Sequence, residues 1–181
     1  MSEITYFETS GPEKTDLTLQ IAKGYAEKER IKRIVVASTT GYTAQKAAEV
    51  FKDFSLVVVT HVAGLREPNG QEFPSDLREQ LEAGGAKVLT TSHAFDGVNR
   101  LADAGSIGQI IRDTLRIFCQ GVKVAVEIAA MAADAGLVRT DEDVISIAGT
   151  GKGADTALVV TPAISRRLFE MRVKKILAKP L

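Results

Sequence analysis

Cysteine is almost absent from this sequence, and histidine is scarce. The 181 residues contain one cysteine, Cys119, and two histidines. A single cysteine excludes an internal disulfide, and so few sulfur and imidazole ligands argue against a structural zinc site, which takes four. Cys119 lies in an apolar stretch without neighbouring bases, which predicts a packed thiol rather than a reactive one.

Long hydrophobic runs and an excess of charge of one sign are also missing. No apolar run approaches the roughly 20 residues that cross a bilayer. The first residues, MSEI, lack the basic and apolar regions of a signal peptide. Lys plus Arg and Asp plus Glu both number 23, so the net charge is zero, which argues against a general nucleic-acid or membrane-surface binder. We therefore expect a cytoplasmic protein that binds neither nucleic acid nor membrane.

The apolar side chains that are present suffice for one packed domain. The chain is 45% hydrophobic and 25% charged, and its length suits a single α/β domain over residues 1–181. Short β-branched runs predict strands, and amphipathic or Ala-rich stretches predict helices between them. This alternation predicts a three-layer α/β/α sandwich around a mainly parallel sheet. The expected strands are 34–37, 56–60, 86–90 and 144–148, and the expected helices are 15–30, 43–51, 74–83, 107–119 and 121–135.

The end of the chain breaks the alternation. The link between Val144–Ala148 and Thr156–Thr161 is too short for a crossover, so these two strands should pair antiparallel. Residues 169–176 alternate in part, which predicts an edge strand, after a polar bend at 165–167. Residues 94–105 carry no pattern that assigns them to an element.

A loop of residues 38–43, STTGYT, follows the first predicted strand and precedes a helix; we call it the hydroxyl loop. A glycine there allows backbone conformations closed to other residues, and the free N–H groups and dipole of a helix start attract anions. The alternative is a plain capped turn with Thr43 as N-cap. Four hydroxyls exceed what one cap needs, so we expect a phosphate site. Its residues are Ser38, Thr39, Thr40, Gly41, Tyr42 and Thr43.

A second loop, GTGKGAD at residues 149–155, separates the last two predicted strands; we call it the glycine loop. It is neither a GxxxxGK[ST] phosphate loop nor a GxGxxG fingerprint that opens a helix. It is either a plain flexible hairpin or a ligand-contacting loop, with Lys152 and Asp155 as its charged groups. The candidate residues are Gly149, Thr150, Gly151, Lys152, Gly153 and Asp155.

Polar side chains also follow two other predicted strands. Thr60 and His61 end one, and Ser92 and His93 follow another. A histidine there either binds a ligand, with acid–base chemistry near neutral pH, or caps a carbonyl, and the sequence shows no partner carboxylate. Because carboxyl ends of parallel strands share one edge, we expect these residues to join both loops there.

Residues 34–48 and 144–160 resemble the C-terminal α/β domain of pyruvate kinases. In that family the loop corresponding to Ser38, Thr39, Thr40, Gly41 and Thr43 holds a phosphate of a sugar bisphosphate in many members, and a second glycine-rich loop corresponds to residues 149–155. A closer resemblance is to stand-alone archaeal proteins built on this domain, which implies flavin mononucleotide (FMN) as ligand. Pyruvate kinase chemistry belongs to a barrel of about 250 residues, so we expect none from this chain.

These observations predict a protein that binds a phosphorylated small molecule, FMN by preference. Two other classes stay open. One is an enzyme, either a flavin-dependent oxidoreductase or a small phosphatase, and the other is a non-catalytic effector-binding regulatory module. We assign no catalytic residue and no metal ligand, and the sequence leaves open whether the chain is a homo-oligomer.

Overall fold

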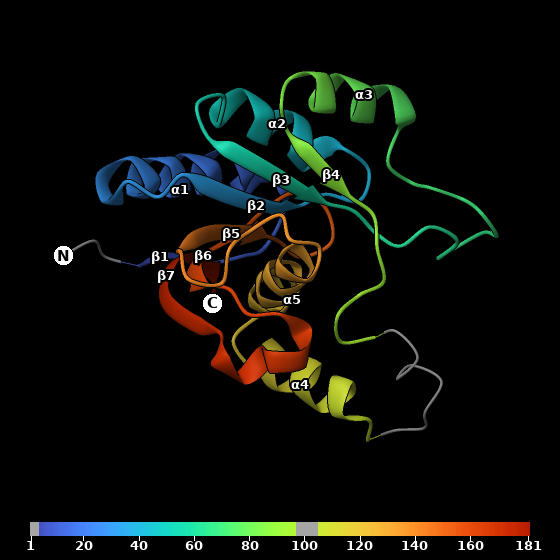
Figure 1. The fold of residues 1–181 in the computed structure, drawn as a ribbon. Coiled ribbons are helices and arrows are strands. Elements are labelled where there is room, and N and C mark those ends of the chain that lie inside the picture. Colours follow the sequence, from blue (N-terminus) through green and yellow to red (C-terminus); the bar gives the residue numbers. More distant parts are fainter. Residues whose placement is uncertain (1–3, 97–104) are drawn as a thin grey trace.

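A computed structural model describes residues 4–96 and 105–181 (Figure 1). Its centre is a seven-stranded sheet in the order β1-β7-β6-β5-β2-β3-β4. The pairs β2–β3, β3–β4, β2–β5 and β1–β7 are parallel, whereas β5–β6 and β6–β7 are antiparallel. The strands are β1 Thr5–Phe7, β2 Arg33–Ala37, β3 Ser55–Val59, β4 Lys87–Leu89, β5 Val144–Ala148, β6 Thr156–Thr161 and β7 Arg172–Pro180.

Helices cover both faces of this sheet (Figure 1). On one face lie α1, α2 and α3; on the other, α5 packs against the sheet and α4 packs against α5. The predicted three-layer α/β/α fold with a mainly parallel sheet is therefore confirmed. The helices are α1 Thr15–Glu29, α2 Tyr42–Val50, α3 Ser75–Ala83, α4 Ile107–Arg116 and α5 Gln120–Asp134, with short 3-10 helices at Pro12–Lys14 and Ser165–Glu170.

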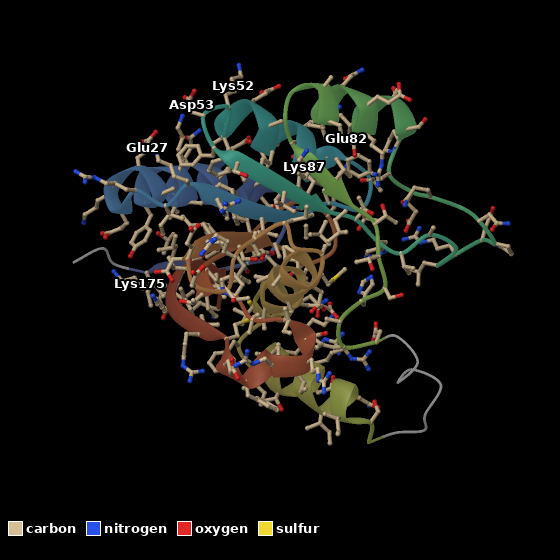
Figure 2. The ribbon with its side chains drawn as sticks, viewed as in Figure 1. Glu27, Lys52, Asp53, Glu82, Lys87 and Lys175 are labelled. Carbon is tan, nitrogen blue, oxygen red and sulfur yellow. The ribbon has the colours of Figure 1, made fainter. Side chains whose placement is uncertain are left out.

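The continuous apolar runs are explained by burial on both faces. Successive side chains of a strand point to opposite sides, so Ile34 and Val36 enter the core under α1 and α2, whereas Val35 enters the core under α5. Most charged side chains lie on the surface, among them the exposed Lys52, Glu82 and Lys175 (Figure 2). Within the described residues, none of the helices combines the length and apolar character needed to cross a bilayer.

The predicted edge strand at 169–176 is wrong both in its residue range and in its place in the sheet. The strand is β7, and it lies between β6 and β1 rather than at the edge. The polar bend at 165–167 begins a 3-10 helix that runs to Glu170. The sequence did not indicate β1, because three residues are too few to show an alternation. It completes the sheet by pairing Thr5 with Ala178 and Phe7 with Pro180.

Two predicted helix ends also need correction, whereas α1 begins at Thr15 as predicted, directly after a 3-10 helix. Gly41 is the N-cap of α2, so Thr43 lies inside the helix. α4 ends before Cys119, which is the N-cap of α5, with its thiol accepting from the N–H of Val122 at 3.4 Å. Of the unassigned residues 94–105, those from 97 to 104 lie outside the described residues.

Candidate functional site

The site lies where the strand order reverses. From β2 the chain passes through α2 to β3 on one side, whereas β5 lies on the other side of β2. Ligands of open α/β sheets bind outside the carboxyl ends of strands at such a point. A cavity of about 490 Å³, which we call the crevice, opens there between the hydroxyl loop, the glycine loop and α5.

Twelve of the sixteen predicted site residues line the crevice, and four do not. Gly41 and Asp155 are buried beside it, whereas Ser92 and Thr150 are exposed away from it. Both predicted loops and both histidines therefore meet, as expected from the shared sheet edge. The lining residues that were predicted are Ser38, Thr39, Thr40, Tyr42, Thr43, Thr60, His61, His93, Gly149, Gly151, Lys152 and Gly153.

The hydroxyl loop is shaped by Gly41. Its φ of 92° is in the left-handed region, which L side chains rarely adopt. A Cβ at this position would also collide with the side chain of Leu77 on α3. Ser38 turns inward, and its Oγ accepts from the N–H of Ala44 at 3.2 Å. Ser38 therefore holds the loop against α2, while Gly41 lets α2 begin at once.

The hydroxyl loop leaves a row of backbone donors unpaired. Among the described residues, none accepts a hydrogen bond from an N–H group of residues 39–43. The last of these groups form the first turn of α2, where the helix dipole adds partial positive charge. Unpaired N–H groups of this kind bind phosphate and carboxylate groups at other helix starts. The local geometry thus suits an anion.

The glycine loop brings a cation to the same place. Lys152 Nζ lies 4.9 Å from the centre of the Tyr42 ring, so it bridges the two loops. Gly149 and Gly153 are required by close packing, because a Cβ on Gly149 would lie 2.6 Å from the Gly153 carbonyl oxygen and one on Gly153 2.5 Å from Thr15 Oγ1. The loop is therefore fixed at both ends.

Asp155 has a structural place in this loop. Its Oδ2 accepts from the N–H of Thr150 at 3.1 Å, and its Oδ1 accepts from the hydroxyl of Thr156 at 2.8 Å. The N–H of neighbouring Ala154 donates to Thr15 Oγ1 at 3.0 Å. Asp155 thus forms its hydrogen bonds within the glycine loop and its flanking strand and does not line the crevice. Thr15 connects the same loop to α1.

His61 and His93 face each other in the crevice; we call them the histidine pair. Their ring centres are 5.2 Å apart in an edge-to-face arrangement. His61 Nδ1 lies 3.4 Å from Glu72 Oε2, and Arg66 Nε lies 3.1 Å from the other oxygen of Glu72. Burial lowers the pKa of His61 below 6.5, and the neighbouring His93 lowers it further, while Glu72 acts in the opposite direction.

A buried ion pair on α5 supports His93. Lys123 Nζ donates to Glu127 Oε2 at 2.5 Å. Both residues are buried, with 4% of the surface of Lys123 and 2% of that of Glu127 exposed. His93 Nδ1 lies 3.6 Å from the same oxygen, and Glu127 Oε1 accepts from the N–H of Phe95 at 3.2 Å. Burial would raise the pKa of Glu127, but the neighbouring His93 and the charge of Lys123 outweigh it and hold the pKa at about 2.

The sequence analysis missed Lys123 and Glu127, together with Arg66 and Glu72. The available signal was a lysine and a glutamate one helical turn apart, inside a helix otherwise rich in alanine. Charged residues are rarely buried without a partner, so such a pair in a buried helix points to an internal ion pair. In the described part of the chain, no group of three or more His, Cys, Asp or Glu side chains is arranged to hold a metal ion.

The fold is that of an α/β domain with a cavity at the edge of its sheet. The sequence from residue 16 to residue 160 matches the family described as the pyruvate kinase, alpha/beta domain. The chain belongs to this family, which confirms the resemblance found at residues 34–48 and 144–160.

Solved structures of pyruvate kinase from Cryptosporidium parvum are similar to this chain over part of their length. One, in complex with ADP, is 14% identical with a TM-score of 0.42, and the match covers 80% of this chain and 22% of that chain. A second is 15% identical with a TM-score of 0.39, over 75% and 20%. A third is 14% identical with a TM-score of 0.40, over 80% and 22%. The chain thus spans about a fifth of the length of these enzymes.

Proposed function

We propose that this protein binds a phosphorylated small molecule in the crevice, with the phosphate on the hydroxyl loop. The row of unpaired N–H groups at residues 39–43, which opens into the crevice beside Lys152, carries this proposal. Phosphate oxygens accept from such groups, and a lysine adds a positive charge. The crevice volume of about 490 Å³ is in the usual range for small-molecule sites.

FMN is the ligand that we put first, from the resemblance to the stand-alone archaeal proteins. The geometry is compatible with it, since the crevice has an anion-binding end at the hydroxyl loop and an apolar wall of Val124, Ile128 and Met131 on α5. A flat aromatic ring system would bury apolar surface against that wall. A sugar phosphate would use the first end and leave the second without a matching group.

Absorbance of the purified protein, followed by mass spectrometry of the released ligand, tests this directly. FMN and riboflavin are then titrated against ligand-free protein, because riboflavin lacks only the phosphate. A hydrogen bond to a charged group contributes about 1.5–3 kcal/mol, so FMN should bind at least about 10-fold more tightly than riboflavin. Equal affinity, or no binding of either, contradicts the flavin assignment.

Lys152→Ala and a matched control locate the phosphate. Lys152 is exposed on the glycine loop, whereas Lys52 is exposed beyond the carboxyl end of α2, away from the crevice. Lys152→Ala should weaken FMN binding several-fold without weakening riboflavin binding, and it should leave the melting temperature of the ligand-free protein unchanged. Lys52→Ala should change neither. A loss shared by both variants would mean that net charge, not this site, determines binding.

Catalysis is the second candidate, favoured by the carboxylates behind both histidines. A histidine oriented by a carboxylate is a common general base, and a base beside bound phosphate suits a small phosphatase. Release of inorganic phosphate from FMN or a sugar phosphate measures this activity. A protein that binds FMN but releases no phosphate is not a phosphatase for it, which leaves the flavin-dependent oxidoreductase and the non-catalytic ligand-binding module.

A further inference from the structure

The crevice holds a second group of charges that phosphate binding by the hydroxyl loop does not use. It consists of the histidine pair, backed by Glu72 and Arg66 on one side and by Glu127 and Lys123 on the other. Burying charges on α5 costs several kcal/mol per ion before pairing offsets it. An Ala-rich helix could fill the same space without them.

We infer that the histidine pair is the proton-binding part of this ligand site, so that binding of an anionic ligand is coupled to uptake of a proton by the pair. The inference rests on the proposed function, since it requires an anion in the crevice. It assigns the pair a role in selecting the charge state of the ligand and in making binding pH-dependent.

The geometry limits how many protons the pair holds without a ligand. Two imidazolium rings with centres 5.2 Å apart repel each other. Arg66 pairs with Glu72 and Lys123 pairs with Glu127, so these cations offset much of the negative charge that the carboxylates present to the histidines. A second proton on the pair is therefore unfavourable while the crevice contains only water.

An anion in the crevice changes this balance. The hydroxyl loop and both histidines line one cavity of about 490 Å³. Charges that share a partly desolvated cavity are screened less than charges on an open surface. A doubly negative phosphate therefore favours protonation of the pair, and by reciprocity protonation of the pair favours the phosphate.

The other charged groups near the pair have partners of their own. Lys152 of the glycine loop lies over the Tyr42 ring. Asp96, in the segment after His93, forms an ion pair with Arg112 of α4. Glu127 is held ionised by its partners. Because the chain has only two histidines, single substitutions of each decide whether a pH effect in this range comes from the pair.

Sulfate is the probe that separates protein from ligand protonation, because it stays doubly charged throughout this pH range whereas a phosphate monoester gains a proton near pH 6. Isothermal titration of sulfate and FMN between pH 5.5 and 8.5 should show wild-type affinity rising as pH falls, by up to about tenfold per pH unit for one coupled proton. His61→Gln and His93→Gln should each flatten this slope for sulfate. A flat wild-type slope, or an unchanged slope in both variants, overturns the inference.

NMR of the wild-type protein tests the same point without a variant. The two histidines give two imidazole Cε1–H signals, which are followed against pH with and without saturating sulfate. Sulfate should move the midpoint of at least one signal to higher pH. If sulfate or FMN binds and neither midpoint moves, the inference fails while the proposed function stands. If no anion binds at any pH, the proposed function fails and the inference fails with it.

Discussion

At the residue scale, the buried pair Lys123–Glu127 is the feature with the largest energetic consequences. Glu127 accepts from Lys123 and from the N–H of Phe95, and it also contacts His93. The charge on each partner is tolerable only because the other is present. Breaking a buried pair by removing one charge costs about 3–5 kcal/mol, whereas removing both charges together is often close to neutral.

Glu127→Gln should therefore lower the free energy of unfolding by about 3–5 kcal/mol, as measured by urea denaturation at pH 7. The amide still has an oxygen for Phe95, so the loss reports the stranded Lys123 charge. Lys123→Met in the same background removes that charge and should recover much of the stability. If the double variant is no more stable than Glu127→Gln alone, the charge pairing is not the cause.

The same carboxylate should contribute to acid unfolding. Its pKa is about 2 in the folded protein, against 4.5 ordinarily. Because the pKa of Glu127 is lower in the folded state, its contribution to the free energy of unfolding is present above about pH 4.5 and is lost as pH falls toward 2. That difference corresponds to on the order of 3 kcal/mol. The free energy of unfolding should fall less steeply between pH 4.5 and 2 in Glu127→Gln than in wild type; parallel curves would contradict the low pKa.

Residue types at strand ends could be predicted from the sequence, but their partners could not. The pattern placed His61 and His93 after strands, and the structure brings them together. Glu72 lies later in the loop that begins near His61, and Glu127 lies on α5. No local spacing encodes these contacts, because one depends on how the loop folds back and the other on how α5 packs against the sheet.

At the element scale, the junction between β2 and α2 depends on a contact with α3. Gly41 lies against Leu77, and its backbone is left-handed. The sequence predicted a glycine with unusual backbone freedom, but not the packing that also excludes a side chain. The strand runs were predictable because their β-branched residues are buried on both faces. Helix starts were predicted to within one residue, and α2 begins one residue early because Gly41 is its N-cap.

Gly41→Ala separates these two effects. The left-handed backbone costs about 1–2 kcal/mol, and crowding against Leu77 costs about 1–3 kcal/mol more. In a Leu77→Ala background the crowding is gone, so Gly41→Ala should cost less there than in wild type. Urea denaturation of the four proteins gives the coupling energy. Additive losses would mean that backbone conformation alone requires the glycine.

At the scale of the whole molecule, sheet topology places the site. The sequence could predict the shared strand edge, since alternating strands and helices produce a parallel sheet. It could not predict that β7 and β1 extend the sheet beyond β6, because β1 is too short to recognise and β7 pairs with it through residues 178–180. That extension lies on the far side of β6 from the crevice, so the error left the predicted site intact.

Ligand binding to the folded state should raise the stability of the whole domain. At 100 times the dissociation constant, a ligand adds about 2.7 kcal/mol, which corresponds to roughly 5–10 °C in melting temperature for a domain of this size. FMN at 1 mM should give a clear shift, riboflavin a smaller one, and a sugar bisphosphate at 1 mM less than FMN because it cannot cover the apolar wall on α5.

The measurement is differential scanning calorimetry of wild type and Lys152→Ala, and the FMN shift should shrink in the variant. A larger shift with the sugar bisphosphate than with FMN would mean that the ligand is a sugar phosphate rather than a flavin. Equal shifts for FMN and riboflavin would contradict the assignment of the phosphate to the hydroxyl loop.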